Sequence, residues 1–161
     1  HILLLRALVY LKEKINFKVL IIGNGILKNT LVRFIKKNNL EKKVKILNFQ
    51  KNPYKFLNKS NLLIHTAKFE GLPNVLIEAQ LLKKFIISSN CPTGPKEILC
   101  NGKAGFLFKN DDYKQLSKKI ILFTEAKKII QRKINYGYKK IDRFNYDYCL
   151  NKYYSEIKKI I

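Results

Sequence analysis

The sequence lacks the residues from which a metal centre or a disulfide framework would be built. It has only two histidines, His1 and His65, and its three cysteines, Cys91, Cys100 and Cys149, form no C-x-x-C pair. Widely spaced cysteines in odd number are typical of reduced thiols in a cytosolic protein. We therefore expect no metal site, no disulfide and a cytoplasmic location.

Long apolar runs are missing as well. A membrane-spanning helix needs about 18 to 20 apolar residues in succession, and no window of this 161-residue chain provides them. The opening HILLLRALVYL is interrupted by Arg6 and is followed by no cleavage site of small residues, so we interpret it as a core-facing helix rather than a signal peptide. Because the chain begins with His1 and not with Met, we expect it to be a piece of a longer polypeptide.

Acidic residues are scarce: 11 Asp and Glu stand against 33 Lys and Arg, and the formal net charge is +22. Nearly all of the excess is Lys, whereas Arg is the residue suited to bidentate recognition of phosphates and bases. The lysines are spread along the chain together with many Asn and Ile residues, as an AT-rich coding sequence produces without any function. The charge would also favour peripheral contact with an anionic membrane, such as the inner face of the plasma membrane. We expect no nucleic-acid partner.

Short β-branched runs alternate with helical patterns as far as residue 110. Strands are expected at residues 18–23, 44–49, 61–66, 84–89 and 106–108. Between the first two, Leu27, Leu31, Phe34 and Ile35 would form the core face of a helix. This alternation predicts a Rossmann-like α/β domain, with a parallel sheet and helices on both faces.

From residue 111 onward the pattern is helical only. Asp111 or Asp112 would cap the first helix of this part. A Tyr-rich helix, with Tyr153 and Tyr154 expected to pack against other residues, ends the chain. We therefore divide the domain, residues 1–161, into an α/β core (1–110) and a carboxy-terminal helical tail (111–161).

Three segments follow strands and should meet at the carboxyl ends of a parallel sheet, where ligands bind in such folds. They are GNGIL, KFEGLPN and NCPTGP. In the second, Gly71 would allow the backbone to turn and Pro73 would suit the start of a helix. The first N–H groups of that helix would then have no acceptor within it. Such a helix end attracts phosphate.

Glu70 precedes this helix and Glu78 lies about five residues inside it, roughly 7–8 Å along its axis. A diphosphate at the helix start would place one hydroxyl-bearing group near each carboxylate. An ordinary turn followed by a helix explains the same residues without a ligand, because acids near a helix start are favourable by themselves. Spacing alone leaves both interpretations open. We expect His65, on the preceding strand, to be a packed residue rather than a catalyst.

FEGLPNVLIEA resembles the E-x7-E signature of retaining glycosyltransferases of family 4, also called glycosyl transferases group 1, which have the GT-B fold. KVLIIGNG, VKILNFQKNPYKFLNKSNLLIHT and FIISSNCPTGPKEILCNGKAGFLF follow in the family's order and spacing. The resemblance thus covers nearly the whole chain. The GLPN form of the turn resembles that of bacterial polysaccharide and lipopolysaccharide transferases more than that of glycogen or sucrose synthases.

The resemblance implies a hexosyltransferase-type enzyme, of which this chain is the carboxy-terminal, donor-binding domain and from which the amino-terminal acceptor domain is absent. By position, Glu70 would be the catalytic-site residue that holds the donor sugar, without acting as a nucleophile, and Glu78 would bind the ribose. The whole donor-binding set would be Gly23, Gly25, Phe49, Glu70, Gly71, Leu72, Pro73, Asn74, Val75 and Glu78. The partners would be a nucleotide sugar, UDP-linked in the first place and GDP-mannose in the second, and a glycan or lipid-linked acceptor. No metal or other cofactor is expected.

Two departures from the family bear on activity. Ala67 stands where the family usually has Ser. The family's first strand, and the Arg and Lys that neutralise the departing diphosphate, lie upstream of the helix that matches residues 3–14, so we expect an exposed sheet edge and weaker leaving-group stabilisation. One alternative is therefore a nucleotide-sugar-binding module that is inactive without an upstream or partner domain. Another is a basic nucleic-acid or membrane-surface protein with a chance motif.

Overall fold

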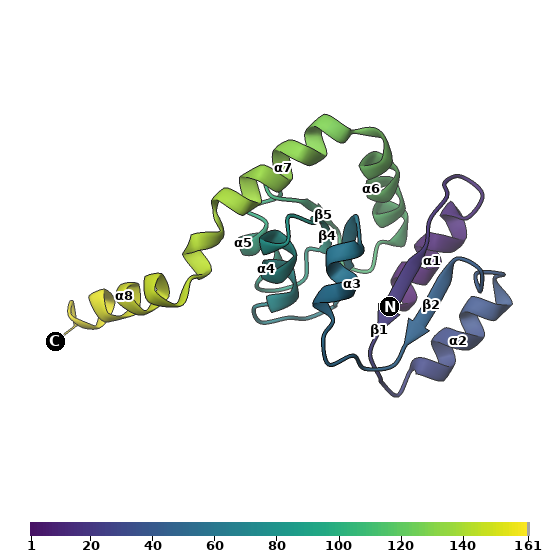
Figure 1. Ribbon diagram of the computed structural model, residues 1–161, viewed down its shortest axis with the longest axis horizontal. Helices are drawn as coiled ribbons and strands as arrows, with labels where there is room; N and C mark the ends of the chain where they lie inside the picture. Colours follow the sequence, from purple (N-terminus) through teal and green to yellow (C-terminus); the bar gives the residue numbers. More distant parts are fainter. Residues whose placement is uncertain (161) are drawn as a thin grey trace.

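Five short strands form the centre of the molecule, and each lies within an expected segment. In the computed structural model, which describes residues 1–160, they are β1 (Val19–Ile22), β2 (Val44–Leu47), β3 (Leu62–His65), β4 (Phe85–Ser89) and β5 (Phe106–Phe108). All the strand pairs are parallel. The predicted α/β class is confirmed (Figure 1).

The strands form two hydrogen-bonded groups, β1–β2 and β3–β4–β5. Among the described residues no ladder joins β1 to β3, so each of these strands has one unpaired edge. The single sheet that the alternation implied is therefore interrupted between β1 and β3, and the exposure of a sheet edge stays a prediction.

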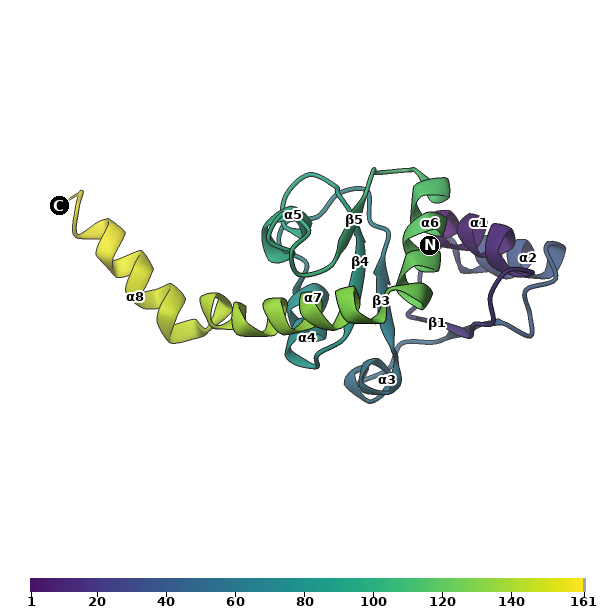
Figure 2. The same cartoon turned by 90° about the horizontal axis from the view of Figure 1, so that it is seen from above.

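Helices cover both faces of β3–β4–β5 because the buried strand β4 alternates its side chains between two cores. Phe85 and Ile87 pack in one cluster with α1 (Ile2–Leu11), α2 (Lys28–Lys37) and α6 (Tyr113–Glu125). Ile86 packs in the other with α4 (Asn74–Leu81) and α5 (Pro95–Ile98). Seen from above, α4 and α5 lie on one side of these strands and α6 on the other (Figure 2). A buried aliphatic or aromatic side chain of this kind stabilises the fold by about 1.5–3 kcal/mol.

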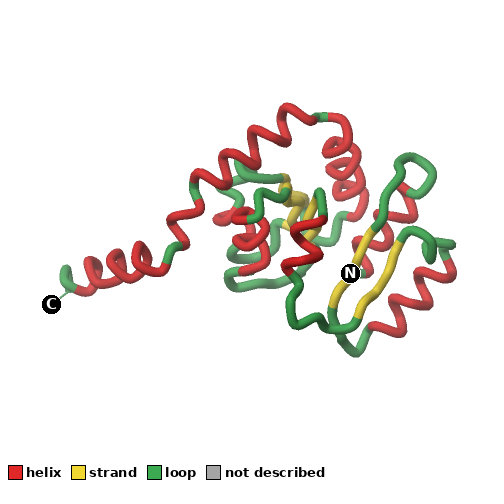
Figure 3. Tube along the Cα trace, viewed as in Figure 1, coloured by secondary structure: helices red, strands yellow, loops and turns green. Residues whose placement is uncertain are grey.

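The helical part after residue 111 begins as expected. The Asp112 carboxylate caps α6 by accepting the N–H of Gln115 at 2.8 Å. After α7 (Lys127–Lys139) and the short 3₁₀ helix η1 (Ile141–Phe144), α8 (Tyr146–Ile157) projects from the body as an arm (Figures 1 and 3). Within residues 1–160, no helix is both long and apolar enough to cross a membrane.

Two packing predictions are wrong. Tyr153 and Tyr154 are 65% and 55% exposed, and α8 has no buried residue, because this helix projects away from the rest of the molecule (Figure 1). Leu27 is also exposed, since α2 begins only after it and the residue therefore lies outside the regular helix. In α2, Leu31 and Ile35 are buried as predicted.

Candidate functional site

The loop that follows β3, residues 66–73, is held at the carboxyl ends of the strands by side chains from its neighbours. Three of its backbone carbonyls accept hydrogen bonds from the segments that follow β4 and β5 or from the last residue of β4. These bonds run from Ser89 Oγ to Ala67 O (2.6 Å), from Asn110 Nδ2 to Lys68 O (2.9 Å) and from Thr93 Oγ1 to Glu70 O. The path of this loop is thus fixed from both neighbouring loops.

Gly94, in the loop after β4, packs directly against the Gly71–Leu72–Pro73 turn. Its φ is +81°, and a Cβ atom on it would lie 2.4 Å from Pro73 Cδ and 2.5 Å from Gly71 O. Only glycine allows that approach. A Cβ atom on Gly71, in contrast, would meet nothing within 4 Å. The turn is therefore packed on its Gly94 side and open around Gly71.

Helix α4 begins directly after this turn and exposes backbone donors. Its N-cap, Pro73, forms no side-chain capping bond. No described residue accepts a hydrogen bond from the N–H groups of Gly71, Leu72, Asn74 or Val75. Unpaired donors at the positive end of a helix form a site suited to an anionic group such as phosphate.

Each of the two predicted carboxylates is hydrogen bonded to a side chain from another element. His65, the last residue of β3, has its Nε2 3.1 Å from Glu70 Oε1. Tyr54, the first residue of α3 (Tyr54–Lys59), donates its hydroxyl to Glu78 Oε1 at 3.2 Å. The charge of Glu78 raises the pKa of Tyr54, because deprotonation would place two anions side by side. Among the described residues, neither Oε2 atom has a hydrogen-bond partner.

The remaining predicted residues lie at the ends of β1 and β2. The Gly23 N–H donates to Leu47 O at 3.0 Å, and no atom lies within 4 Å of a Cβ built on Gly23 or Gly25. The Phe49 side chain is 72% exposed. Within residues 1–160, no hydrogen bond joins these three residues to the Glu70–Glu78 segment, so their part in donor binding stays a prediction.

Sequence reasoning missed the side chains that anchor the loop, the glycine that packs on the turn and the partner of Glu78: Ser89, Thr93, Asn110, Gly94 and Tyr54. NCPTGP was expected to approach the site, but nothing in it indicated which residues contact the turn. No sequence signal pointed to Tyr54, which is 24 positions from Glu78.

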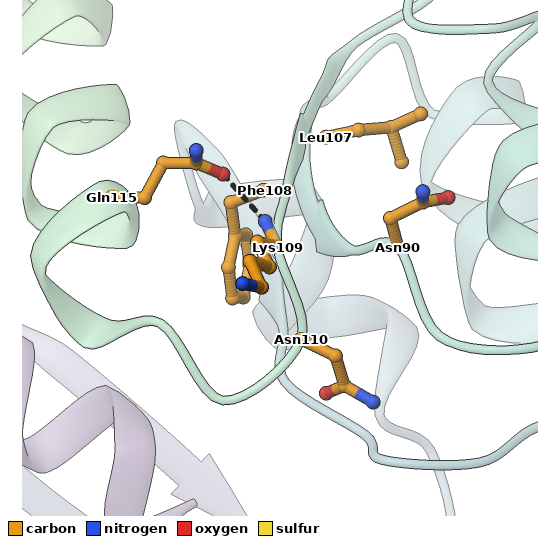
Figure 4. Close-up of a pocket in the computed structure, with 6 residues that line it drawn as sticks. All are labelled: Asn90, Leu107, Phe108, Lys109, Asn110 and Gln115. Carbon is orange, nitrogen blue, oxygen red and sulfur yellow. Dashed lines mark hydrogen bonds between the residues drawn. The ribbon is translucent and has the colours of Figure 1, made fainter.

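A shallow hollow adjoins the anchored loop at the ends of β4 and β5 (Figure 4). The backbone N–H of Lys109 donates to Gln115 Oε1 there. The lining residues are Asn90, Leu107, Phe108, Lys109, Asn110 and Gln115. Asn110 belongs both to this hollow and to the anchor on Lys68. In the part of the chain that the structure describes, no three His, Cys, Asp or Glu residues gather as metal ligands would.

The model of the family described as glycosyl transferases group 1 matches residues 1–140. The chain belongs to this family. The predicted resemblance is therefore confirmed at the level of a glycosyltransferase domain, and so is the link to enzymes of polysaccharide synthesis that the names of several relatives express.

Two curated relatives illustrate the similarity of this group 1 domain. An uncharacterized glycosyltransferase of Methanocaldococcus jannaschii is 48% identical over 98 residues, which cover 60% of this chain and 24% of that protein. The N-acetylgalactosamine-N,N'-diacetylbacillosaminyl-diphospho-undecaprenol 4-alpha-N-acetylgalactosaminyltransferase of Campylobacter jejuni is 37% identical over 112 residues, which cover 70% of this chain and 30% of that enzyme. The matched segments thus span less than a third of the length of either relative.

Solved structures share its fold. A glycosyltransferase of Rickettsia africae superposes with a TM-score of 0.87 at 23% identity, over 99% of this chain and 44% of that one. The Anabaena protein HepE, in complex with UDP, superposes with a TM-score of 0.85 at 19% identity, over all of this chain and 45% of that one. At such identities the likeness concerns the fold.

The two glycines of the turn region should respond differently to substitution. Gly94→Ala places a methyl group in contact with Pro73 and the Gly71 carbonyl at a positive φ, so we expect it to lower the free energy of unfolding by about 1–3 kcal/mol. Gly71→Ala, which meets no atom, should change it by less than about 0.5 kcal/mol. Urea unfolding followed by circular dichroism measures both. Equal stability of the two variants would contradict the packing of Gly94 on the turn.

The hydrogen bond between Tyr54 and Glu78 should appear in the titration of the phenol. We expect Glu78→Gln to lower the pKa of Tyr54 towards the ordinary tyrosine value, because the neighbouring negative charge is removed while the shape is kept. NMR of Cζ-labelled tyrosine measures this pKa, and Tyr54→Phe identifies the resonance. An unchanged pKa in Glu78→Gln would show that the two side chains are apart in solution.

Proposed function

We propose that this group 1 domain is the donor-binding part of a retaining glycosyltransferase. The enzyme would transfer a sugar from a nucleoside diphosphate sugar to a glycan or lipid-linked acceptor in the synthesis of cell-surface polysaccharide. The observation that carries the proposal is the open turn and uncapped helix start between two carboxylates, each of which has one oxygen without a partner among residues 1–160.

The chemistry of a nucleotide sugar matches this order of groups. The diphosphate, which is anionic, would accept hydrogen bonds from the amides between Gly71 and Val75. The sugar hydroxyls would donate to Glu70, and the ribose hydroxyls would donate to Glu78, about one turn into α4. Donors already in place at the diphosphate also stabilise the charge that develops as the glycosidic bond breaks.

Glu70 would position the sugar without attacking it. In a retaining transfer of this type the acceptor approaches on the face from which the diphosphate leaves, so no covalent intermediate on the protein is needed. The hydrogen bond from His65 occupies one oxygen of Glu70 and leaves the other for a sugar hydroxyl. This arrangement supports a role in holding the donor.

A UDP-sugar is our first choice of donor and GDP-mannose the second. HepE has been solved with UDP and with UDP-glucose, and a pneumococcal O-GlcNAc transferase of the same fold with UDP and GlcNAc. The Campylobacter relative is named for transfer of N-acetylgalactosamine to a diphospho-undecaprenol-linked acceptor. We propose a UDP-linked hexose or N-acetylhexosamine here, bound without a metal ion.

Turnover would require an acceptor domain in addition to this one. The relatives are more than twice as long as the segments that match, which supports a two-domain enzyme of which this chain forms the donor half. A lipid-linked acceptor would bring the enzyme to the cytoplasmic face of a membrane, where a net charge of +22 favours contact with anionic lipids. Alone, the chain is proposed to bind the donor with little or no transfer.

Calorimetric titration with UDP, GDP and their sugars tests this function. We expect UDP and UDP-sugars to bind, with or without EDTA, and Glu78→Ala to weaken both by about tenfold, because a hydrogen-bonded ionic contact to the ribose is lost. The matched control is Glu41→Ala, which removes the same charge from an exposed residue just before β2, at the end of the strand away from the site.

Three results would contradict the proposal. Absence of nucleotide binding would exclude a donor site. Equal weakening by Glu78→Ala and Glu41→Ala would show that affinity reflects net charge rather than a ribose contact. Tight, salt-dependent RNA binding that neither variant alters would favour a basic nucleic-acid-binding protein instead.

A further inference from the structure

His65 occupies an unusual place in β3. Its neighbours in the strand, Leu62 to Ile64, are aliphatic, whereas His65 is a buried polar residue with only 9% of its surface exposed. Burying an imidazole is costly unless both ring nitrogens find partners. Both do: Nδ1 lies 2.9 Å from Ser88 Oγ on the paired strand, and Nε2 lies 3.1 Å from Glu70 Oε1.

The hydrogens of this group can be placed by considering what each atom can donate. An ionised Glu70 only accepts hydrogen bonds, so His65 Nε2 must carry a hydrogen. Ser88 has a single hydroxyl hydrogen, which either goes to Ser89 O, 3.0 Å away, or turns to Nδ1. The ring is an imidazolium in the first arrangement and neutral in the second. In both, the hydrogen on Nε2 points at Glu70.

This contact fixes Glu70 at a second point. Its backbone carbonyl is already held by Thr93. With Oε1 held by His65, the side chain loses the rotational freedom that a glutamate in a loop otherwise has, while it stays 34% exposed. A carboxylate fixed in this way forms a further hydrogen bond at a smaller cost in conformational entropy.

We infer that His65 is a positioning residue, which orients the Glu70 carboxylate for a hydroxyl of the sugar in a nucleoside diphosphate sugar. This inference rests on the proposed function and deepens it. It assigns affinity for the sugar to the His65–Glu70 pair and affinity for the nucleotide to the Tyr54–Glu78 pair. Removal of His65 therefore weakens the sugar contact and spares the nucleotide.

The test compares UDP with UDP-glucose and UDP-N-acetylglucosamine by calorimetry. His65→Phe keeps an aromatic ring but cannot donate, and should weaken binding of the better UDP-sugar about tenfold with UDP unchanged. His65→Gln keeps an N–H donor of similar reach and should recover most of the affinity. Tyr54→Phe, the matched variant at the other carboxylate, should weaken UDP and UDP-sugar by the same factor.

A double-mutant cycle distinguishes positioning from general damage to the fold. If His65 acts through Glu70, His65→Phe has no further effect on UDP-sugar binding once Glu70→Ala is present. Circular dichroism of each variant checks folding, and His65→Gln remains informative if His65→Phe does not fold. Equal loss of UDP and UDP-sugar affinity in the His65 variants, or additive losses in the cycle, would overturn the inference and leave the proposed function intact.

NMR supplies a test that needs no ligand. His1→Ala leaves His65 as the only histidine, so its ring nitrogens can be observed without overlap. We expect a hydrogen on Nε2 whose shift changes in Glu70→Ala. A His65 ring that carries a hydrogen only on Nδ1 would overturn the inference, whatever the result of the titrations with UDP and UDP-sugars. If the wild type binds neither UDP nor a UDP-sugar, the proposed function fails and the role in sugar binding fails with it, even where the contact with Glu70 is observed.

Discussion

The hydrogen bonds that hold the backbone carbonyls of residues 67–70 are the interactions on which the candidate site depends. Side chains of Ser89, Thr93 and Asn110 donate to three of these carbonyls, and Gly94 packs against the turn that follows. A loop anchored through its acceptors keeps its path without using its own N–H groups. The N–H groups of Gly71, Leu72, Asn74 and Val75, which have no acceptor within residues 1–160, are consequently available to an external acceptor at the positive end of α4.

Glu70 and Glu78, two of the few acidic residues of this chain, lie on either side of these free amides. In a protein of net charge +22, Glu70 and Glu78 could pair with lysine, yet their observed partners are His65 and Tyr54. A lysine paired with each acid would compete with a hydroxyl-bearing ligand for the carboxylate. The Tyr54 hydroxyl and the His65 ring each contact a single carboxylate oxygen and leave the other oxygen available. The surrounding positive field, meanwhile, raises the local concentration of anionic ligands. Charge attracts the donor, and the two carboxylates would recognise its hydroxyls.

Local sequence predicts the elements of this fold well and their partners poorly. Short apolar runs, most of them with β-branched residues, located all five strands, and Asp112 was foreseen as a cap because its acceptor lies three residues from the donor. The E-x7-E spacing identified Glu70 and Glu78, and with them the family. The partner of Glu78 was not predictable, since Tyr54 is 24 positions away, and neither was the contact of His65 with Ser88, 23 positions away. The exposure of α8 and the interruption between β1 and β3 likewise depend on tertiary contacts. A local sequence pattern contains no information about such contacts.

The most direct test of the central claim is an amide NMR titration of the ¹⁵N-labelled chain with UDP and a UDP-sugar. The account predicts that the largest shifts occur at Gly71, Leu72, Asn74 and Val75, whose N–H groups have no partner among the described residues. The UDP-sugar should additionally shift Glu70 and the ring of His65. Shifts confined to the hollow around Asn90, Lys109 and Gln115, or spread over the lysines without saturation, would contradict it.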